Sequence, residues 1–381
     1  MKIILKIGIF ILNIIYSVLK LFPVQNKITF ISRQANTPNI DFILLKKELE
    51  KDYKIVILCK TLDNGIFNKI KYFFHMFKQM YNIATSKAVV LDSYCIPIGI
   101  LHHRKNLKVI QMWHALGAFK KFGKSIIGKD ESKVKINGVN KLSPKELSQI
   151  MGMHKNYSYV FASSNLASKG FKEAFGCSEE MIKIYPLPRI DLILDKNNQK
   201  EISNKIYDKY KSLKSKSKKN ILYCPTFRKD SNDIKYINEL INKVDYSKYN
   251  LILKLHPLTK HNIIDDRVII DNEFKTYEMA FISDYIITDY SAVVYEIALL
   301  NKPIYFYAYD KDSYIDKRDF YLDYDKDMPG KIYTNIDKLL SEIENSKYDN
   351  KKLNNFLNKY IAKCDISYTE DITRFIKSII E

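Results

Sequence analysis

Two histidines lie at points of this chain where side chains could do chemistry. His114 follows the apolar run KVIQMW (108–113), and its neighbour Trp113 is the only tryptophan of the chain. His256 follows a second apolar run, within YNLILKLHP (249–257). A near-neutral imidazole suits the removal of a proton from a hydroxyl group. The pattern favours a site that uses histidine, although a His-Pro pair after a strand is also typical of a plain turn.

Hydroxyl, guanidinium and carboxylate groups follow other apolar runs. CPTFR places Thr226 and Arg228 after one run, and DYS places Asp289 and Ser291 after another. Glu296 lies further along the helix predicted for AVVYEIALL, where its carboxylate could hold the two hydroxyls of a ribose. A helix start binds anions, and the planar fork of arginine binds phosphate. Thr226 and Ser291 are equally typical of helix caps, and Glu296 of a solvated surface.

Alternating strands and helices must position these groups. The apolar runs that predict strands are 27–32, 54–60, 87–93, 108–113, 159–164, 220–225, 249–257, 267–271, 284–289 and 302–307. Helical segments separate them, which predicts parallel α/β sheets. In open parallel sheets, ligands bind beyond the carboxyl ends of the strands, and this is where the groups above lie.

A charged, apolar-poor segment divides the chain. We predict four parts: a membrane-associating helix over 1–25, an α/β domain over 26–195, a linker over 196–219 that includes a polar helix, and a second α/β domain over 220–381, whose last helix packs back on the first domain. Two Rossmann-like α/β domains that face a cleft, preceded by a membrane-interface helix, are typical of the GT-B type. At this point the GT-B type is an analogy of fold.

The amino terminus carries a long apolar stretch. Its uncharged run, 7–19, is flanked by Lys6 and Lys20 and is shorter than the roughly 20 residues that span a bilayer. We therefore predict a helix that lies in the membrane interface, with lysines that reach anionic headgroups. A signal-anchor helix and a plain buried helix are the alternatives.

The net charge of +19 favours an anionic partner. The chain is also rich in Lys, Ile and Asn, so a drift toward A/T-rich codons would explain much of the charge as solvated surface. Aromatic residues are spread through the chain and form no basic platform, so binding of nucleic acid is not predicted. The five cysteines are scattered and fit a reducing, cytoplasmic setting, without a disulfide framework or a zinc site. Glycine-rich nucleotide motifs are absent, so we predict no cofactor. No residues are assigned as metal ligands, and dependence on a divalent metal is left open.

Several segments together resemble one family. QMWHALGAFKKFG resembles the Q-x-W-H-G-x-x-x-K-x-x-G segment of the CDP-glycerol glycerophosphotransferase family, whose members prime and polymerise teichoic acid. Further similar segments, in the family's order, are YPLPRID (185–191), LYCPTFR (222–228), KLHP (254–257) and the stretch from ITDYS to MPG (287–330). The chain departs from the family pattern at Ala115, Ala292 and Asp319, where the family has Gly, Ser and Gly, and at Glu296, where it has Asp.

The resemblance implies a reaction and its residues. CDP-glycerol, or a related CDP-alditol, would donate a polyol phosphate to a hydroxyl of a lipid-linked anionic acceptor at the cytoplasmic face of the membrane, and CMP would leave. Implied as catalytic are His114, the candidate base, and His256. Implied as binding the acceptor are Trp113, Lys120 and Lys121. Implied as binding the donor are Thr226, Arg228, His256, Asp289, Ser291, Glu296 and Arg318. A CDP-ribitol-type transferase and a GT-B glycosyltransferase that uses a nucleotide sugar are the alternatives.

Overall fold

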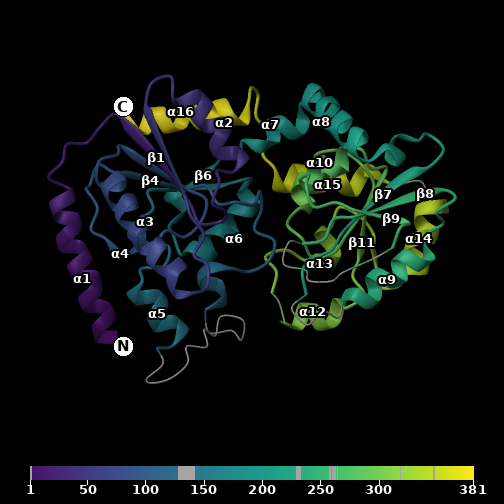
Figure 1. The fold of residues 1–381 in the computed structure, drawn as a ribbon, viewed down its shortest axis with the longest axis horizontal. Helices are drawn as coiled ribbons and strands as arrows, with labels where there is room; N and C mark the ends of the chain where they lie inside the picture. Colours follow the sequence, from purple (N-terminus) through teal and green to yellow (C-terminus); the bar gives the residue numbers. More distant parts are fainter. Residues whose placement is uncertain are drawn as a thin grey trace. The chain divides into compact units, whose positions relative to one another are not determined.

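Two compact α/β units make up the chain (Figure 1). The first unit comprises Met1–Arg189 and Ala362–Glu381, and the second comprises Ile190–Ile361. The computed structural model describes residues 2–127, 142–228, 233–256, 259, 263, 265–317, 319–345 and 348–381.

The first unit is built on a parallel sheet of six strands in the order β2-β1-β3-β4-β5-β6. Its strands are β1 (Lys27–Ser32), β2 (Lys54–Cys59), β3 (Ala88–Leu91), β4 (Lys108–Gln111), β5 (Tyr159–Ala162) and β6 (Ile182–Ile184). The direction in which strands are added reverses between β1 and β3, so this pair forms the topological switch point.

Helices cover this sheet. They are α1 (Lys2–Leu19), α2 (Ile40–Leu49), α3 (Ile66–Ala84), α4 (Ile96–Ile100), α5 (Pro144–Ile150), α6 (Asn165–Phe175) and α16 (Tyr368–Ile380), with 3₁₀ turns η1 (Gly123–Ile126) and η3 (Glu179–Met181). Polar caps fix their starts: the side chains of Asn39 and Ser164 accept backbone N–H bonds at the first turns of α2 and α6. The carboxyl-terminal helix α16 packs against α2.

The second unit has its own parallel sheet of six strands, in the order β12-β11-β10-β7-β8-β9. Its strands are β7 (Lys219–Cys224), β8 (Tyr249–Leu253), β9 (Val268–Ile270), β10 (Tyr285–Thr288), β11 (Ile304–Tyr307) and β12 (Ile332–Tyr333). Its helices are α7 (Arg189–Leu194), α8 (Lys196–Lys209), α9 (Asp233–Lys243), α10 (Thr276–Phe281), α11 (Val294–Ala298), α12 (Lys311–Lys317), α13 (Tyr324–Asp327), α14 (Ile336–Asn345) and α15 (Asn350–Tyr360), with η4 (Lys211–Lys214). Helix α7 begins at Arg189, the last residue of the first unit's main segment. The switch point lies between β7 and β10.

The central strands are buried on both faces, as parallel sheets covered by helices require. All six residues of β1 are buried, and so are all four of β3 and of β11. This explains why the strands read as continuous apolar runs in the sequence. The two sheets confirm the predicted α/β class with two Rossmann-like units.

The boundary segment 196–219, interpreted as a polar helix plus linker, holds α8 and η4, and α8 packs against α10 within the second unit. One detail differs from our expectations. The helix predicted over 292–300 is much shorter, because α11 has only five residues. Backbone bonds that span three residues, such as Val294 N–H to Ser291 O, form a tight turn ahead of it. Ser291 therefore belongs to this turn and does not cap α11.

Candidate active site

His114 lies just beyond the carboxyl end of β4, beside the loop that follows β3. Its Nδ1 is 2.9 Å from the carbonyl oxygen of Asp92. Because a carbonyl can only accept, Nδ1 carries the proton and Nε2 keeps its lone pair. Burial lowers the pKa of His114 below the ordinary value of 6.5, and the charge of Arg189 lowers it further, against the opposing effect of the Asp92 carbonyl. His114 is thus a neutral imidazole with a basic nitrogen available for proton transfer.

Trp113 holds a backbone conformation that bulky residues rarely adopt, with φ at 61°. Such a conformation costs on the order of 1–3 kcal/mol and persists only where the surroundings enforce it. The Trp113 ring stacks on Phe122, with centroids 4.5 Å apart, and lies 4.1 Å from the His114 ring. Phe175 meets the indole edge-on at 5.4 Å. The indole therefore shields one side of His114 from water.

A series of buried hydrogen bonds holds the backbone turn at Trp113 in place. The Trp113 N–H donates to Oε1 of Gln111 at 3.0 Å, which orients the Gln111 amide. Gln111 Nε2 then donates to the hydroxyl of Tyr157 at 3.1 Å and to the Ser93 carbonyl at 3.2 Å. The Tyr157 hydroxyl is 2.9 Å from Nδ1 of His154. Burial lowers the pKa of His154 to about 3, so this histidine stays neutral. Its Nδ1 then accepts the hydrogen bond of the Tyr157 hydroxyl.

The buried ion pair between Asp41 and Arg189 also contacts this turn. Asp41, in the first turn of α2, accepts from the backbone N–H of Arg189 at 2.8 Å and from its Nε at 2.9 Å. Asp41 is fully buried. Arg189 Nη2 also donates to the carbonyl oxygen of His114 at 3.4 Å. The pair therefore joins the start of α7 to α2 and contacts the backbone of the candidate base.

Lys120 and Lys121 follow on the same loop, which closes at Gly123. The φ of Gly123 is +58°, and a Cβ there would lie 2.4 Å from the Ala174 carbonyl oxygen, so only glycine fits. Lys121 lies 3.8 Å from Glu173. Glycine at this point lets Phe122 reach the Trp113 ring, and it places both lysines within a short stretch of the candidate base.

In the second unit, three of the predicted donor-site residues form one hydrogen-bonded cluster across the switch point. Asp289, which follows β10, accepts from the Thr226 N–H at 2.8 Å and from its hydroxyl at 2.6 Å. Arg228 Nη2 donates to Asp289 at 3.0 Å, while its Nε donates to Asp310 at 2.9 Å. Arg228 Nη1 donates to the Thr226 carbonyl at 2.7 Å. Most N–H groups of Arg228 are thus used inside the protein.

Three tyrosines surround the Arg228 guanidinium. The rings of Tyr314, Tyr290 and Tyr309 lie 4.7, 5.3 and 5.6 Å from its central carbon. The arginine is only 8% exposed and Asp289 is 0% exposed. Cation–π contacts and two carboxylates together offset the cost of burying this charge. The cluster therefore sets the shape of the loops after β7 and β10.

Three further predicted donor-site residues, His256, Ser291 and Glu296, belong to the same unit. His256 is exposed beyond β8, with its ring centroid 5.5 Å from that of Phe227. The Ser291 hydroxyl oxygen accepts from the Val293 N–H at 3.3 Å. Glu296 is in the first turn of α11 and is partly buried. Arg318 lies outside the described residues. Over the part of the chain that the structure describes, no group of three or more His, Cys, Asp or Glu could hold a metal ion.

Some residues of these sites were missed at the sequence level. Asp92 and Asp310 follow β3 and β11, so the strand-end rule that selected His114 and Asp289 would have found them too. Arg189 lies within YPLPRID, one of the segments that resemble the family, but neither it nor Asp41 follows a predicted strand, and their pairing joins positions far apart in the chain.

The neutral imidazole of His114, partly buried beyond a strand end, belongs to a chain of two Rossmann-like units, which is the architecture of the GT-B type. The sequence profile of the family described as CDP-glycerol:poly(glycerophosphate) glycerophosphotransferase matches residues 14–378. The chain belongs to this family. The predicted enzyme class, a transferase of the CDP-glycerol glycerophosphotransferase type, is confirmed.

Individual relatives agree with this assignment. The teichoic acid ribitol-phosphate primase of Bacillus spizizenii is 32% identical over 375 residues, which are 94% of this chain and 93% of that protein. The teichoic acid glycerol-phosphate primase of Bacillus subtilis is 29% identical over 80% of this chain and 77% of that protein. A structure of the wall teichoic acid polymerase TagF superposes with a TM-score of 0.70 at 23% identity, covering 100% of this chain and 96% of the other. This likeness confirms the GT-B-type fold.

Proposed function

We propose that this protein transfers a polyol phosphate from a CDP-activated alditol to a hydroxyl of a lipid-linked teichoic acid acceptor at the cytoplasmic face of the membrane. The observation that carries the proposal is the neutral His114, whose Nε2 is free to accept a proton, in a chain of this family. The first unit supplies the base and the acceptor side, and the second unit supplies the donor side.

In the proposed reaction, the acceptor oxygen attacks the phosphorus that bears the polyol. A new P–O bond forms, the bond to the CMP phosphate oxygen breaks, and CMP leaves with that electron pair. His114 Nε2 takes the proton of the attacking hydroxyl, and Trp113 excludes water that would otherwise compete. Lys120 and Lys121 draw in the anionic acceptor.

The donor site of the proposal combines contact residues and shaping residues. His256, Ser291 and Arg318 contact the diphosphate, and His256 also stabilises its charge as the bond to CMP breaks. Glu296 holds the ribose hydroxyls. Thr226, Arg228 and Asp289 already bond to one another, so we assign them the role of shaping the loops that receive the diphosphate.

Two polyols remain in question, and a different observation favours each. The likeness to a ribitol-phosphate primase covers nearly the whole of both chains, whereas the likeness to a glycerol-phosphate primase covers about four fifths. The family description itself names CDP-glycerol. We propose CDP-ribitol as the first donor to test and CDP-glycerol as the second.

A comparison of the two donors decides the polyol. The purified enzyme receives CDP-ribitol and CDP-glycerol separately, with a lipid-linked polyol phosphate primer in detergent, and CMP release is measured. We expect kcat/KM for CDP-ribitol to exceed that for CDP-glycerol by about 100-fold or more, because groups of the site that bond to the extra hydroxyls of ribitol are left unpaired by the shorter polyol. Equal turnover of both donors would contradict a site that selects the polyol.

The pH dependence of kcat/KM tests the assignment of the base. Burial lowers the pKa of His114 below 6.5, so the base stays unprotonated at neutral pH. Activity should therefore be constant from pH 7 down to about 6.5 and fall only below it, as the imidazole takes up a proton. A limb with an apparent pKa above 7 would show that another group, or a charged His114, controls the reaction.

A further inference from the structure

Arg33 is the first residue after β1, at the switch point of the first sheet. Its backbone N–H donates to the hydroxyl oxygen of Ser93 at 3.0 Å. Ser93 directly follows Asp92, whose carbonyl accepts from Nδ1 of His114 at 2.9 Å. Arg33 and the candidate base therefore bond to neighbouring residues of one loop, at the edge where open parallel sheets bind their ligands.

The guanidinium of Arg33 has no partner among the described residues. It makes no hydrogen bond and no ion pair with them, and its buried Nε is unsatisfied. Three other arginines each bond to a carboxylate, namely Arg189, Arg228 and Arg267. Arg104 donates to backbone carbonyls. Arg33 is only partly exposed, and a partly buried charge without a partner is costly unless an anion completes its site.

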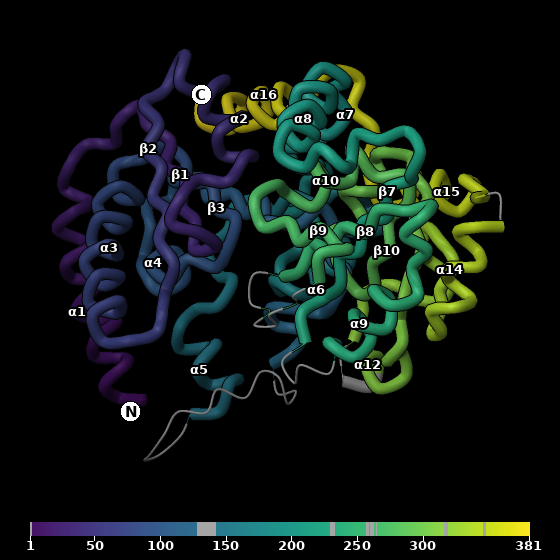
Figure 2. Tube along the Cα trace, turned by 45° about the vertical axis from the view of Figure 1, so that its right-hand side comes forward, coloured from purple at the N-terminus to yellow at the C-terminus, as the bar shows by residue number. Residues whose placement is uncertain are grey.

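Two tyrosines lie close to this guanidinium. Its central carbon is 5.7 Å from the centre of the Tyr94 ring. Tyr72 belongs to α3, which contacts both β1 and α4 (Figure 2). The Tyr72 hydroxyl is buried and unsatisfied, because the nearby Gln79 amide does not meet it in hydrogen-bonding geometry. Burial raises the pKa of Tyr72 to about 12, and the charge of Arg33 opposes this effect. The hydroxyl therefore keeps its proton at neutral pH and can donate it to an anion.

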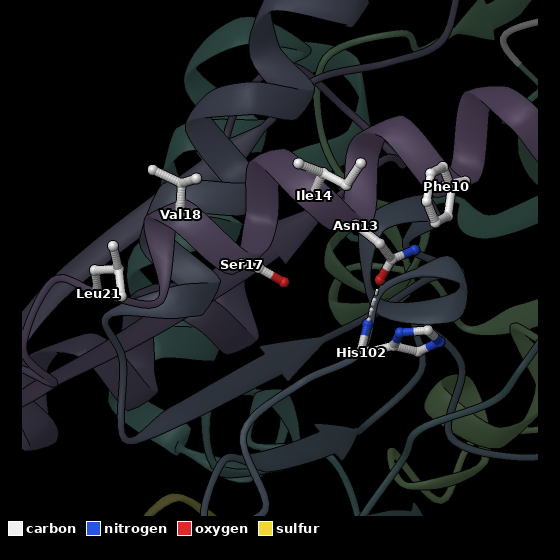
Figure 3. A pocket seen from close by; sticks show the side chains of 7 residues that line it. All are labelled: Phe10, Asn13, Ile14, Ser17, Val18, Leu21 and His102. Carbon is white, nitrogen blue, oxygen red and sulfur yellow. Dashed lines mark hydrogen bonds between the residues drawn. The ribbon is translucent and has the colours of Figure 1, made fainter.

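The groove along α1 offers no such pair of donors. It has a volume of about 510 Å³, and none of the described residues that line it is a lysine, arginine, aspartate or glutamate. Figure 3 shows Asn13 directed toward His102, and the His102 N–H donates to Asn13 Oδ1 at 2.9 Å. An anion would meet no cation among these lining residues, so Arg33 is the better candidate for binding a phosphate.

The donors at Arg33 and Tyr72 suit a phosphate group. A guanidinium presents N–H groups in a planar fork that matches two oxygens of a phosphate, and the tyrosine hydroxyl would supply a third bond. The acceptor of the proposed reaction is a chain of polyol phosphates, which carries phosphodiester groups besides the hydroxyl that attacks. Arg33 belongs to the first unit, to which we assign the acceptor side.

We propose that Arg33 and Tyr72 bind a phosphodiester of the acceptor chain and thereby position its terminal hydroxyl for attack. This inference rests on the proposed transfer reaction and names the residues that select an acceptor bearing phosphate. Neither residue takes part in the bond changes at the reacting phosphorus. Their loss should therefore weaken binding of the acceptor and leave binding of the CDP donor unchanged.

Steady-state kinetics separate an acceptor phosphate from a donor phosphate. Arg33→Gln should raise KM for a lipid-linked polyol phosphate primer by about tenfold or more and leave KM for the CDP donor within about twofold. Arg33→Lys keeps the charge without the planar fork, so it should recover only part of the loss. Arg374→Gln, at an exposed arginine of the same unit, is the matched control and should leave both KM values within about twofold. A rise in the donor KM alone, or no change in either KM, would overturn the proposal.

Binding without turnover separates this inference from the proposed reaction. A water-soluble oligomer of polyol phosphate is titrated into the enzyme by calorimetry, with no CDP donor present. The wild type should bind it about tenfold or more tightly than Arg33→Gln does, and the free polyol should not distinguish the two proteins. Equal affinities, or no binding by the wild type, would overturn the inference even where CMP release establishes the transfer. A difference in affinity without turnover of any CDP-alditol would support the phosphate site and contradict the reaction.

Thermal unfolding distinguishes binding from a structural role. The Tyr72 hydroxyl has no partner in the described residues, so Tyr72→Phe should leave Tm unchanged or raise it slightly, while KM for the primer rises several-fold. Arg33→Gln should likewise leave Tm unchanged or higher, because it removes an unpaired and partly buried charge. A lower Tm for either variant, together with an unchanged KM for the primer, would assign that residue to the fold and overturn its role in binding.

Discussion

Replacing His114 with asparagine should lower kcat by about 10²–10⁴-fold and leave the affinity for the CDP donor within about twofold. The asparagine amide nitrogen occupies roughly the place of Nδ1, so it can still donate to the Asp92 carbonyl, which accepts from His114 at 2.9 Å. Only the basic Nε2 is lost. The measurement is acceptor-dependent CMP release, with donor binding followed by calorimetry on the same preparation.

Two companion variants make this result specific. His114→Gln restores a nitrogen or oxygen near the position of Nε2 but no base, and it should be as inactive as His114→Asn. His102→Asn, at an exposed histidine beside α1, should keep near-normal turnover. A His114→Asn enzyme that turns over at close to the wild-type rate would exclude His114 as the base. Loss of donor binding in the same variant would instead indicate a structural role.

The second large effect is expected at Asp289. Asp289→Ala should reduce the free energy of unfolding of the second unit by about 3–5 kcal/mol, the usual cost of breaking a buried ion pair. The variant removes the acceptor for the Thr226 N–H and hydroxyl and leaves the buried Arg228 with a single carboxylate, Asp310. Urea unfolding, followed by tyrosine fluorescence and circular dichroism, measures the change. Asp266→Ala, at an exposed aspartate of the same unit, is the control and should change stability by less than about 0.5 kcal/mol.

A second substitution tests whether the unpaired charge causes this loss. In an Asp289→Ala background, Arg228→Met removes the charge that Asp289 had neutralised, and its apolar side chain suits the surrounding tyrosines. The double variant should therefore be more stable than the sum of the two single changes predicts, by about 1 kcal/mol or more. Additive losses would show that Asp289 and Arg228 do not act as a pair. Neither double nor single variant should bind the donor normally, because the loops after β7 and β10 lose their shape.

The sequence predicts the strands of this fold well because both sheets are buried on two faces. Apolar runs such as 27–32 and 54–60 end within a residue of β1 and β2. The same logic places His114, Thr226 and Asp289 beyond the ends of strands. Prediction from composition fails for α11. Residues 292–300 have the composition of a helix, but the backbone forms tight turns before α11 begins. Composition does not distinguish a regular helix from successive turns that bury the same side chains.

Other features depend on contacts that no local pattern reveals. The Asp41–Arg189 pair joins residues that are 148 positions apart. The left-handed conformation of Trp113 depends on Gln111 and on the aromatic rings that surround it. Packing decides which apolar residues face inward, and packing is a property of the whole unit.

The central claim, transfer of a polyol phosphate, is tested most directly by the mass of the product. The enzyme is incubated with a CDP-alditol and a lipid-linked primer, the primer is examined by mass spectrometry, and CMP is quantified in the same reaction. The account predicts a primer that gains polyol phosphate units, with one CMP released for each. An unchanged primer with every CDP-alditol, together with turnover of nucleotide sugars, would contradict the account and assign the chain to the glycosyltransferases.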